Sequence, residues 1–152
     1  PLSFPMITPA EAPPPAPEGE IVLPTGRFTV EELEVFLNSL PVDITYVDRD
    51  DRVRYYSGSR HRIFLRTPAV IGRKVQNCHP QKSVHAVQRI IDEFRAGTRD
   101  RAEFWLQLDG RFVHIRYLPL YDRRGDYMGV LEVTQDATDI RRLEGEKRLI
   151  DD

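Results

Sequence analysis

The chain has little cysteine, and this shortage excludes several kinds of site. Cys78 is the single cysteine among 152 residues, so no disulfide can form within the chain and no zinc site can be built from several cysteines. No apolar run approaches the roughly 20 residues that a membrane-spanning helix needs. The first residues are rich in proline and lack the basic and apolar blocks of a signal peptide. We therefore expect a cytoplasmic protein that does not cross a membrane.

An excess of charge of one sign is also absent. The chain has 22 basic and 24 acidic residues, with a net charge of -2 at pH 7. A large basic surface for nucleic acid is therefore excluded. No Ser-His-Asp spacing, glycine-rich phosphate loop or metal-ligand triad stands in the sequence, so we predict that the chain is not an enzyme.

Composition divides the chain into three parts. Residues 1–27 hold eight of the twelve prolines and are predicted to be a disordered or extended linker. Residues 28–138 carry the patterns of a folded domain. Residues 139–152 have a roughly heptad apolar spacing, which predicts a C-terminal linker helix of the signalling kind. The chain begins at Pro1 and not at methionine, so we expect it to be part of a longer polypeptide.

A first helix is predicted to begin at Thr29. Thr29 and Glu32 have the spacing of a capping box, and Phe28 with Leu33 can form a hydrophobic staple. Pro41 should end this helix. Its apolar residues share one face, so it must dock on something; they are Val30, Leu33, Phe36, Leu37 and Leu40.

Five strands and a longer helix are predicted after Pro41. Residues 44–47 and 53–56 form the first two strands, and a helix runs from Pro80 to Gly97 with one apolar face. Asp109-Gly110 is a strong hairpin signal, and it sets Ala102 opposite Tyr117. The last strand is residues 127–134.

The predicted pairing assigns the faces of this sheet. A register that keeps apolar residues together sets Ile115 opposite Val133 and Arg116 opposite Glu132. One face is then the core, with Phe104, Leu106, Ile115, Tyr117, Leu131 and Val133. The other face holds Trp105, Phe112 and His114, and we expect the helix of residues 29–40 or a partner subunit to cover it.

The order and spacing of these elements resemble a PAS domain. The resemblance lies in Ile44 to Asp48, Ile71 to Val75, His79-Pro80, Gly129 to Val133 and Asp136 to Thr138. It implies an α+β fold with a five-stranded antiparallel sheet, helices on one face, the N-terminal amphipathic helix on the other, and a C-terminal signalling helix. The stretch from Gly72 to His85 is similar to PAS domains attached to hemerythrin-like bundles in prokaryotic proteins of unknown function. No hemerythrin ligand set is present, so such a bundle would lie outside this chain.

The resemblance implies a sensory or regulatory module for signal transduction. Its cavity would lie between the sheet and the long helix, and a homodimer and other domains of the same polypeptide are its expected partners. The alternatives are a pure dimerisation or protein-interaction adaptor with a filled core, and a haem-based gas or redox sensor. The ligand stays unknown, because an apolar cavity leaves no signature distinct from an ordinary core. The predicted lining is Val87, Ile91, Phe104, Leu106, Ile115 and Tyr117.

The residues disfavour two cofactors that PAS domains bind. Light-sensing PAS domains resemble this chain at Gly72-Arg73, but their photoreactive cysteine follows that pair more closely than Cys78 does, and Thr134 stands where they have a glutamine; this disfavours flavin. For haem, His85 lies near the right distance after Pro80. Its helical phase, however, opposes the apolar stripe and directs it to water. No metal site is predicted, unless His85 or His79 ligates a haem.

The junction of Cys78, His79 and Pro80 is the last candidate site. It lies where a cavity of this kind would open, and it offers a soft sulfur and a group that titrates near neutral pH. The functional hypothesis is that it contacts a ligand or reports oxidation. The alternative is that the three residues only shape the turn before the helix.

Overall fold

The N-terminal unit of the computed structural model is small and begins with a hairpin. The structure describes residues 18–60 and 62–150, and the chain divides into two compact units after Ser39. Strands β1 (Glu20–Leu23) and β2 (Gly26–Thr29) pair antiparallel. Within the stretch of residues 1–27 predicted to be a disordered or extended linker, residues 20–27 belong to this hairpin, whose strands are joined by a Pro-Thr turn. Its residues 1–17 lie outside the described part.

Helix α1 (Val30–Asn38) follows directly and has the predicted capping box. The Glu32 amide donates to Thr29 Oγ1 at 3.0 Å, and the Thr29 amide donates to Glu32 Oε1 at 2.8 Å. The ring of Phe28 contacts Phe36, with centroids 5.4 Å apart. Phe36 is 54% exposed, so much of the apolar face of α1 is free to pack. Docking of α1 on the sheet stays a prediction.

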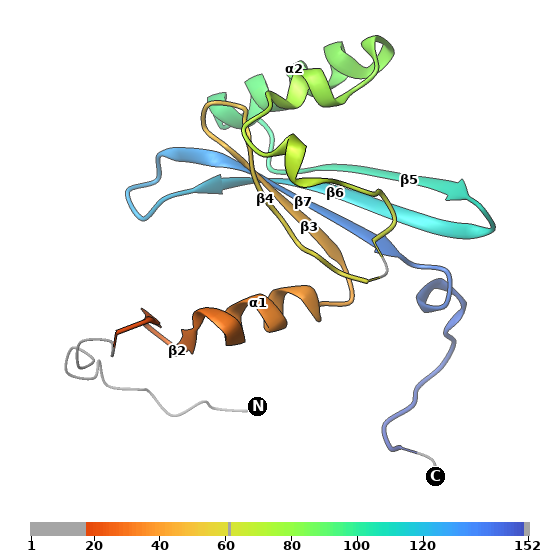
Figure 1. Cartoon of the computed structure of the whole chain (residues 1–152). Coiled ribbons are helices and arrows are strands. Elements are labelled where there is room, and N and C mark those ends of the chain that lie inside the picture. The colour runs from red at the N-terminus through yellow and green to blue at the C-terminus, as the bar shows by residue number, and fades with distance from the viewer. Residues whose placement is uncertain (1–17, 61, 151–152) are drawn as a thin grey trace. The chain divides into compact units, whose positions relative to one another are not determined.

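The second unit is an α+β fold built on one antiparallel sheet. Strands β3 (Asp43–Asp48) and β4 (Val53–Tyr56) come first, and β5 (Ala102–Leu108), β6 (Arg111–Tyr121) and β7 (Tyr127–Asp136) come last. Their spatial order is β4-β3-β7-β6-β5. Between them, two 3-10 turns (Pro68–Val70 and Val75–Cys78) lead into helix α2 (Gln81–Ala96), which ends at Gly97. Figure 1 shows α2 and the turns on one side of the sheet. The predicted fold class is confirmed.

The β5–β6 hairpin has the predicted register. Asp109 and Gly110 have φ angles of 50° and 78°, as a two-residue type I′ turn requires. Ala102 lies opposite Tyr117, and Phe104 lies opposite Ile115. This pairing was readable from the sequence because a tight turn fixes the register of both strands.

The β6–β7 register departs from the prediction at a β-bulge. Tyr121 pairs with Tyr127, as the predicted register requires, but Leu120 pairs with Gly129. Met128 is therefore an extra residue on β7, and every later residue of β7 is displaced by one position. A displacement of one residue exchanges the two faces of a strand.

The bulge changes which side chains face α2. Glu132 lies opposite Tyr117 and not opposite Arg116, which instead lies opposite Val133. The predicted placement of Leu131 and Val133 on the core face is wrong for the same reason. The predicted pairing of Arg116 with Glu132 is therefore wrong.

Gly129 supports this bulge. Its φ angle is 145°, and a Cβ atom added there would lie 2.0 Å from the carbonyl oxygen of Val47. No other residue type fits so close an approach between β7 and β3 without moving the backbone.

The core of the second unit lies under α2. One cluster joins Val47, Val53, Phe94, Ala102 and Val130. Phe104 and Leu106, predicted to be core residues, are 44% and 37% exposed because β5 is an edge strand. Leu106→Ala should therefore cost less than the roughly 2–5 kcal/mol expected for a buried leucine.

The C-terminal segment differs from the predicted linker helix of residues 139–152. Ile140–Arg142 forms a 3-10 turn, and within described residues 139–150 no α-helix follows it. Leu143 and Ile150 are 77% and 91% exposed. So short a segment does not hold an α-helix without a surface to pack on. Across the described residues, helices long and apolar enough to cross a bilayer are absent.

Candidate functional site

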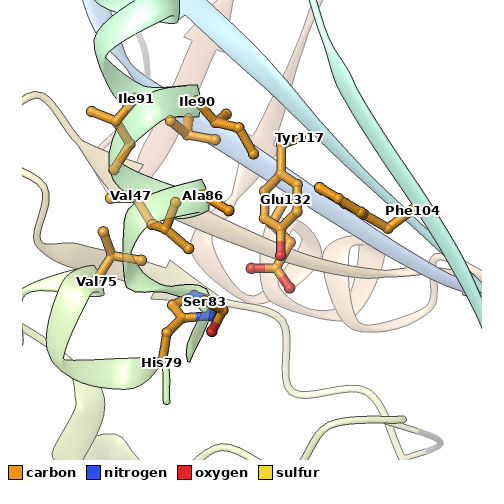
Figure 2. Close-up of a pocket in the computed structure, with 12 residues that line it drawn as sticks. Val47, Val75, His79, Ser83, Ala86, Ile90, Ile91, Phe104, Tyr117 and Glu132 are labelled. Atoms are coloured by element: carbon orange, nitrogen blue, oxygen red, sulfur yellow. The ribbon is translucent and has the colours of Figure 1, made fainter. Parts of the chain in front are cut away.

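A cavity of about 170 Å³ lies between α2 and the sheet, where the sequence predicts one. Figure 2 shows His79 and Ser83 toward one end and Ile90 and Ile91 toward the other, with Glu132 and Tyr117 between them. The lining residues are mostly apolar: Val47, Val75, His79, Ser83, Ala86, Val87, Ile90, Ile91, Phe104, Tyr117, Val130 and Glu132. The site is therefore an apolar chamber with a few polar groups.

Four strands and one helix position most of these side chains. Helix α2 presents Ser83, Val87 and Ile91 because residues four apart share one helical face. Val130 and Glu132 alternate toward the same side of β7, and Tyr117 lies opposite Glu132 on β6. Since β7 is the central strand, Glu132 lies in the middle of the sheet.

Glu132 is the buried charged group of the cavity wall, with 9% of the residue exposed. Its Oε2 accepts from Arg66 Nη2 at 3.3 Å, and its Oε1 accepts from Thr134 Oγ1 at 3.5 Å. Arg66 comes from the segment between β4 and α2. The buried Nε of Arg66 has no hydrogen-bond partner within the described chain. The carboxylate is thus held by one weak ion pair and one long hydrogen bond.

Two further polar groups in the cavity are uncharged at neutral pH. Burial, assisted by the nearby Glu132 carboxylate, raises the pKa of Tyr117 well above its ordinary value, so its hydroxyl keeps its proton. Burial lowers the pKa of His79; the Glu132 charge opposes this and the Arg66 charge adds to it. A phenol donor and a neutral imidazole therefore share the cavity with one carboxylate.

The geometry does not form a nucleophile. Ser83 Oγ donates to the Pro80 carbonyl at 3.0 Å and so directs its proton into the first turn of α2 and away from His79. In the part of the chain that the structure describes, no three His, Cys, Asp or Glu side chains gather as a metal site. The arrangement suits reversible binding of a small molecule.

Five of the nine residues predicted from the sequence as site residues line the cavity: His79, Val87, Ile91, Phe104 and Tyr117. Ile115 is buried in the core, 8% exposed, and Leu106 lies further along the edge strand β5. Both face the side of the sheet that holds the cavity but lie beyond its lining.

Cys78 and His85 lie outside the cavity. Cys78 packs against the core cluster, and its Sγ lies 3.6 Å from the Lys74 carbonyl oxygen. This is the position of a small apolar packing residue. His85 is exposed on α2 and, with Arg89 and Arg99, lines a separate surface hollow between α2 and β5. Its position agrees with the helical phase and does not fit a haem ligand in this cavity.

Sequence reasoning missed Glu132 as a site residue. The predicted register turned it to the opposite face, toward Arg116. A signal for the true arrangement was present in Met128-Gly129, because an isolated glycine inside a strand pattern often marks a bulge. Ser83, Ala86 and Val130 were missed as well.

Comparison with known proteins identifies this architecture. A family model described as PAS domain matches residues 33–138. A crystal structure of a C-terminal domain from Streptococcus mutans is 36% identical, covers 82% of this chain and 97% of that chain, and has a TM-score of 0.76. The comparison with curated proteins finds no match.

More distant structures share the fold. The PAS domain of BvgS from Bordetella pertussis is 18% identical, with a TM-score of 0.53, and covers 74% of this chain and 92% of that chain. A sensory box sensor histidine kinase from Vibrio cholerae is 16% identical, with a TM-score of 0.51, and covers 70% of this chain and 89% of that chain. At these identities the likeness concerns the fold alone.

Proposed function

Because the chain belongs to the PAS domain family, we propose that it is a sensory module that binds a small molecule between α2 and the sheet and passes the signal to a partner domain. The observation that carries this proposal is the cavity itself. It holds a carboxylate, a phenol and a neutral imidazole among apolar side chains. The proposal assigns no catalytic role to the chain.

Size and polarity indicate the ligand's scale. A cavity of about 170 Å³ compares with the roughly 150 Å³ engineered cavities that accept benzene. Polar groups placed in an apolar cavity cost free energy unless something hydrogen-bonds to them. A compact ligand with polar atoms at one end would offset that cost. A haem is too large for the cavity in this conformation.

Strand β7 offers a route for the signal. It carries Glu132 in the cavity and ends two residues before Thr138, whose Oγ1 accepts from the Phe112 amide at 2.9 Å. The Ala137 amide donates to the Phe112 carbonyl at 2.8 Å, and the guanidinium of Arg141 lies 4.1 Å from the Phe112 ring centroid. These contacts couple the segment that leaves β7 to β6.

The partner domain belongs, in this proposal, to the same polypeptide. Its kind is indicated by the resemblance of Gly72 to His85 to PAS domains attached to hemerythrin-like bundles. A hemerythrin-like output is therefore the first candidate. A cytoplasmic setting is part of the same proposal and rests on the low cysteine content.

Homodimerisation is a second candidate function, favoured by one surface feature. Trp105 is 61% exposed on the edge strand β5, beside the His114–Glu103 contact of 2.8 Å. Exposed tryptophan is typical of protein interfaces. An adaptor would use this face without any ligand, so ligand binding separates the two functions.

The test is direct binding to the cavity. Mass spectrometry and absorption spectroscopy of extracts from the purified chain should reveal a co-purified small molecule. Toluene, titrated against the isotope-labelled chain by NMR, should shift resonances of Val87 and Ile91. Val87→Phe should fill the cavity and abolish those shifts. The control His85→Phe, on the exposed side of α2, should leave them unchanged. A chain that binds no small molecule and no toluene would favour the adaptor.

A further inference from the structure

The charge on the cavity wall has one sign. Among the described residues that line the cavity, Glu132 is the charged one, since the imidazole of His79 is neutral. Arg66, which pairs with Glu132, is not among the residues that line the cavity. The carboxylate is therefore the charged group that a ligand in the cavity contacts directly.

This carboxylate has unused hydrogen-bonding capacity. A carboxylate can accept about four hydrogen bonds. Glu132 accepts from Arg66 at 3.3 Å and from Thr134 at 3.5 Å, and both distances exceed the roughly 2.7–2.9 Å of a strong charge-assisted bond. The protein thus leaves lone pairs of a desolvated anion open toward the cavity.

The neighbouring groups favour the same kind of ligand. Ser83 Oγ donates its hydrogen bond to the Pro80 carbonyl, so toward the cavity the hydroxyl oxygen can act only as an acceptor. The rings of Phe104 and Tyr117 meet edge to face with centroids 5.9 Å apart, and aromatic rings attract cations. An anionic ligand would instead stand against Glu132 at close range in a low-dielectric site, which opposes binding.

We propose that the cavity selects a small amine: an apolar body of about one ring that carries a cationic or N–H-donating head bound by Glu132. This inference rests on the proposed ligand-binding function and deepens it by naming the ligand class. The apolar body lies among Val47, Ile90 and Ile91, and the head lies among Glu132 and Ser83. Recognition is by charge and donors at one end and by size at the other.

Three probes with one common body test the proposal on the full chain. Toluene, benzylamine and benzoate share a phenyl ring and differ in a neutral, cationic or anionic substituent. We expect NMR titration at pH 7 to give a dissociation constant for benzylamine at least tenfold lower than that for benzoate. This comparison uses the unaltered chain, so it does not depend on the folding of any variant.

The variant Glu132→Gln then identifies the recognising group. It should weaken benzylamine binding about tenfold or more, as expected for loss of a hydrogen bond to a charged group, and should change toluene binding less than twofold. Glu144→Gln, which removes the same charge from the exposed C-terminal segment, should change neither.

The outcomes are distinguishable. Equal or tighter binding of benzoate, or equal losses of toluene and benzylamine in Glu132→Gln, would overturn the amine assignment. Binding of toluene alone would overturn it while leaving the ligand-binding function intact. Failure of all three probes on the unaltered chain would overturn both.

Discussion

The Arg66–Glu132 pair should stabilise the fold little more than two apolar residues in its place would. The two side chains are 17% and 11% exposed and share one contact of 3.3 Å. The free-energy cost of removing two charges from water is offset only by good ion-pair geometry and additional hydrogen bonds. Here the Nε of Arg66 lacks a hydrogen-bond partner within the described chain. Arg66→Met leaves the carboxylate without its cation and should cost about 3 kcal/mol of unfolding free energy.

The complementary substitutions complete the cycle. Glu132→Leu should cost about 2 kcal/mol, less than Arg66→Met, because the more exposed guanidinium can relax toward solvent. The double variant removes both desolvated charges and should lie within about 1 kcal/mol of the parent, or above it. The coupling free energy between the two sites is then about 4 kcal/mol, the difference between the summed single losses and the double loss.

Urea unfolding followed by circular dichroism measures all four proteins. The matched control is the exposed pair Arg148–Glu146, whose side chains are 81% and 69% exposed and whose coupling should stay below about 1 kcal/mol. Additive losses at Arg66 and Glu132 would refute the reasoning, because each side chain would then stabilise the fold independently. In that case the buried Glu132 carboxylate would stabilise the fold by itself, and its burial would not indicate a ligand.

Three further predictions follow from the fold. Gly129→Ala should lower the unfolding free energy by roughly 2–4 kcal/mol, because the added Cβ clashes with the Val47 carbonyl oxygen. The control Gly125→Ala, at φ 86° with open space around it, should cost only about 1 kcal/mol. Equal losses of the two variants in thermal denaturation would show that the clash is relieved without cost. Burial lowers the pKa of His79, so the unfolded chain binds the proton more readily than the folded chain. The unfolding free energy should therefore fall as the pH drops below about 6.5. The ring should titrate below that pH by NMR, and in His79→Gln this part of the pH dependence should vanish. Deletion of residues 1–40 should expose an apolar sheet face and change the oligomeric state or raise aggregation in sedimentation measurements; an unchanged monomer with an unchanged melting temperature would contradict the predicted docking of α1.

Local signals in the sequence were sufficient for most elements. The capping box at Thr29, the turn at Asp109-Gly110 and the end of α2 at Gly97 are each fixed by a few neighbouring residues. The helical phase of α2 likewise placed His85 at the exposed side. The hairpin of residues 20–29 was missed because proline-rich composition dominated that region.

The candidate site could be predicted only in part. Residues on α2 and on the β5–β6 hairpin followed from periodicity and register, so Val87, Ile91 and Tyr117 were found, and His79 was found from its place at the junction before Pro80. Glu132 was not, because its direction depends on a bulge that two other strands impose on β7. The residue pattern of β7 alone is compatible with either of its faces turned toward α2. Contacts with strands distant in sequence decide which face is turned there.

The bulge at Met128 ties the character of the chamber to the register of one strand. If Met128 paired with Leu120, so that β7 had no extra residue, the predicted pairing would continue along β7, with Leu131 and Val133 turned under α2 and Glu132 turned to the opposite side, across from Arg116. The chamber would then be lined by aliphatic side chains, and its carboxylate would lie beside a guanidinium on the other face of the sheet. A chamber that recognises molecules and a solid scaffold for assembly are thus separated by one step of strand register, without any change in the side chains that α2 contributes.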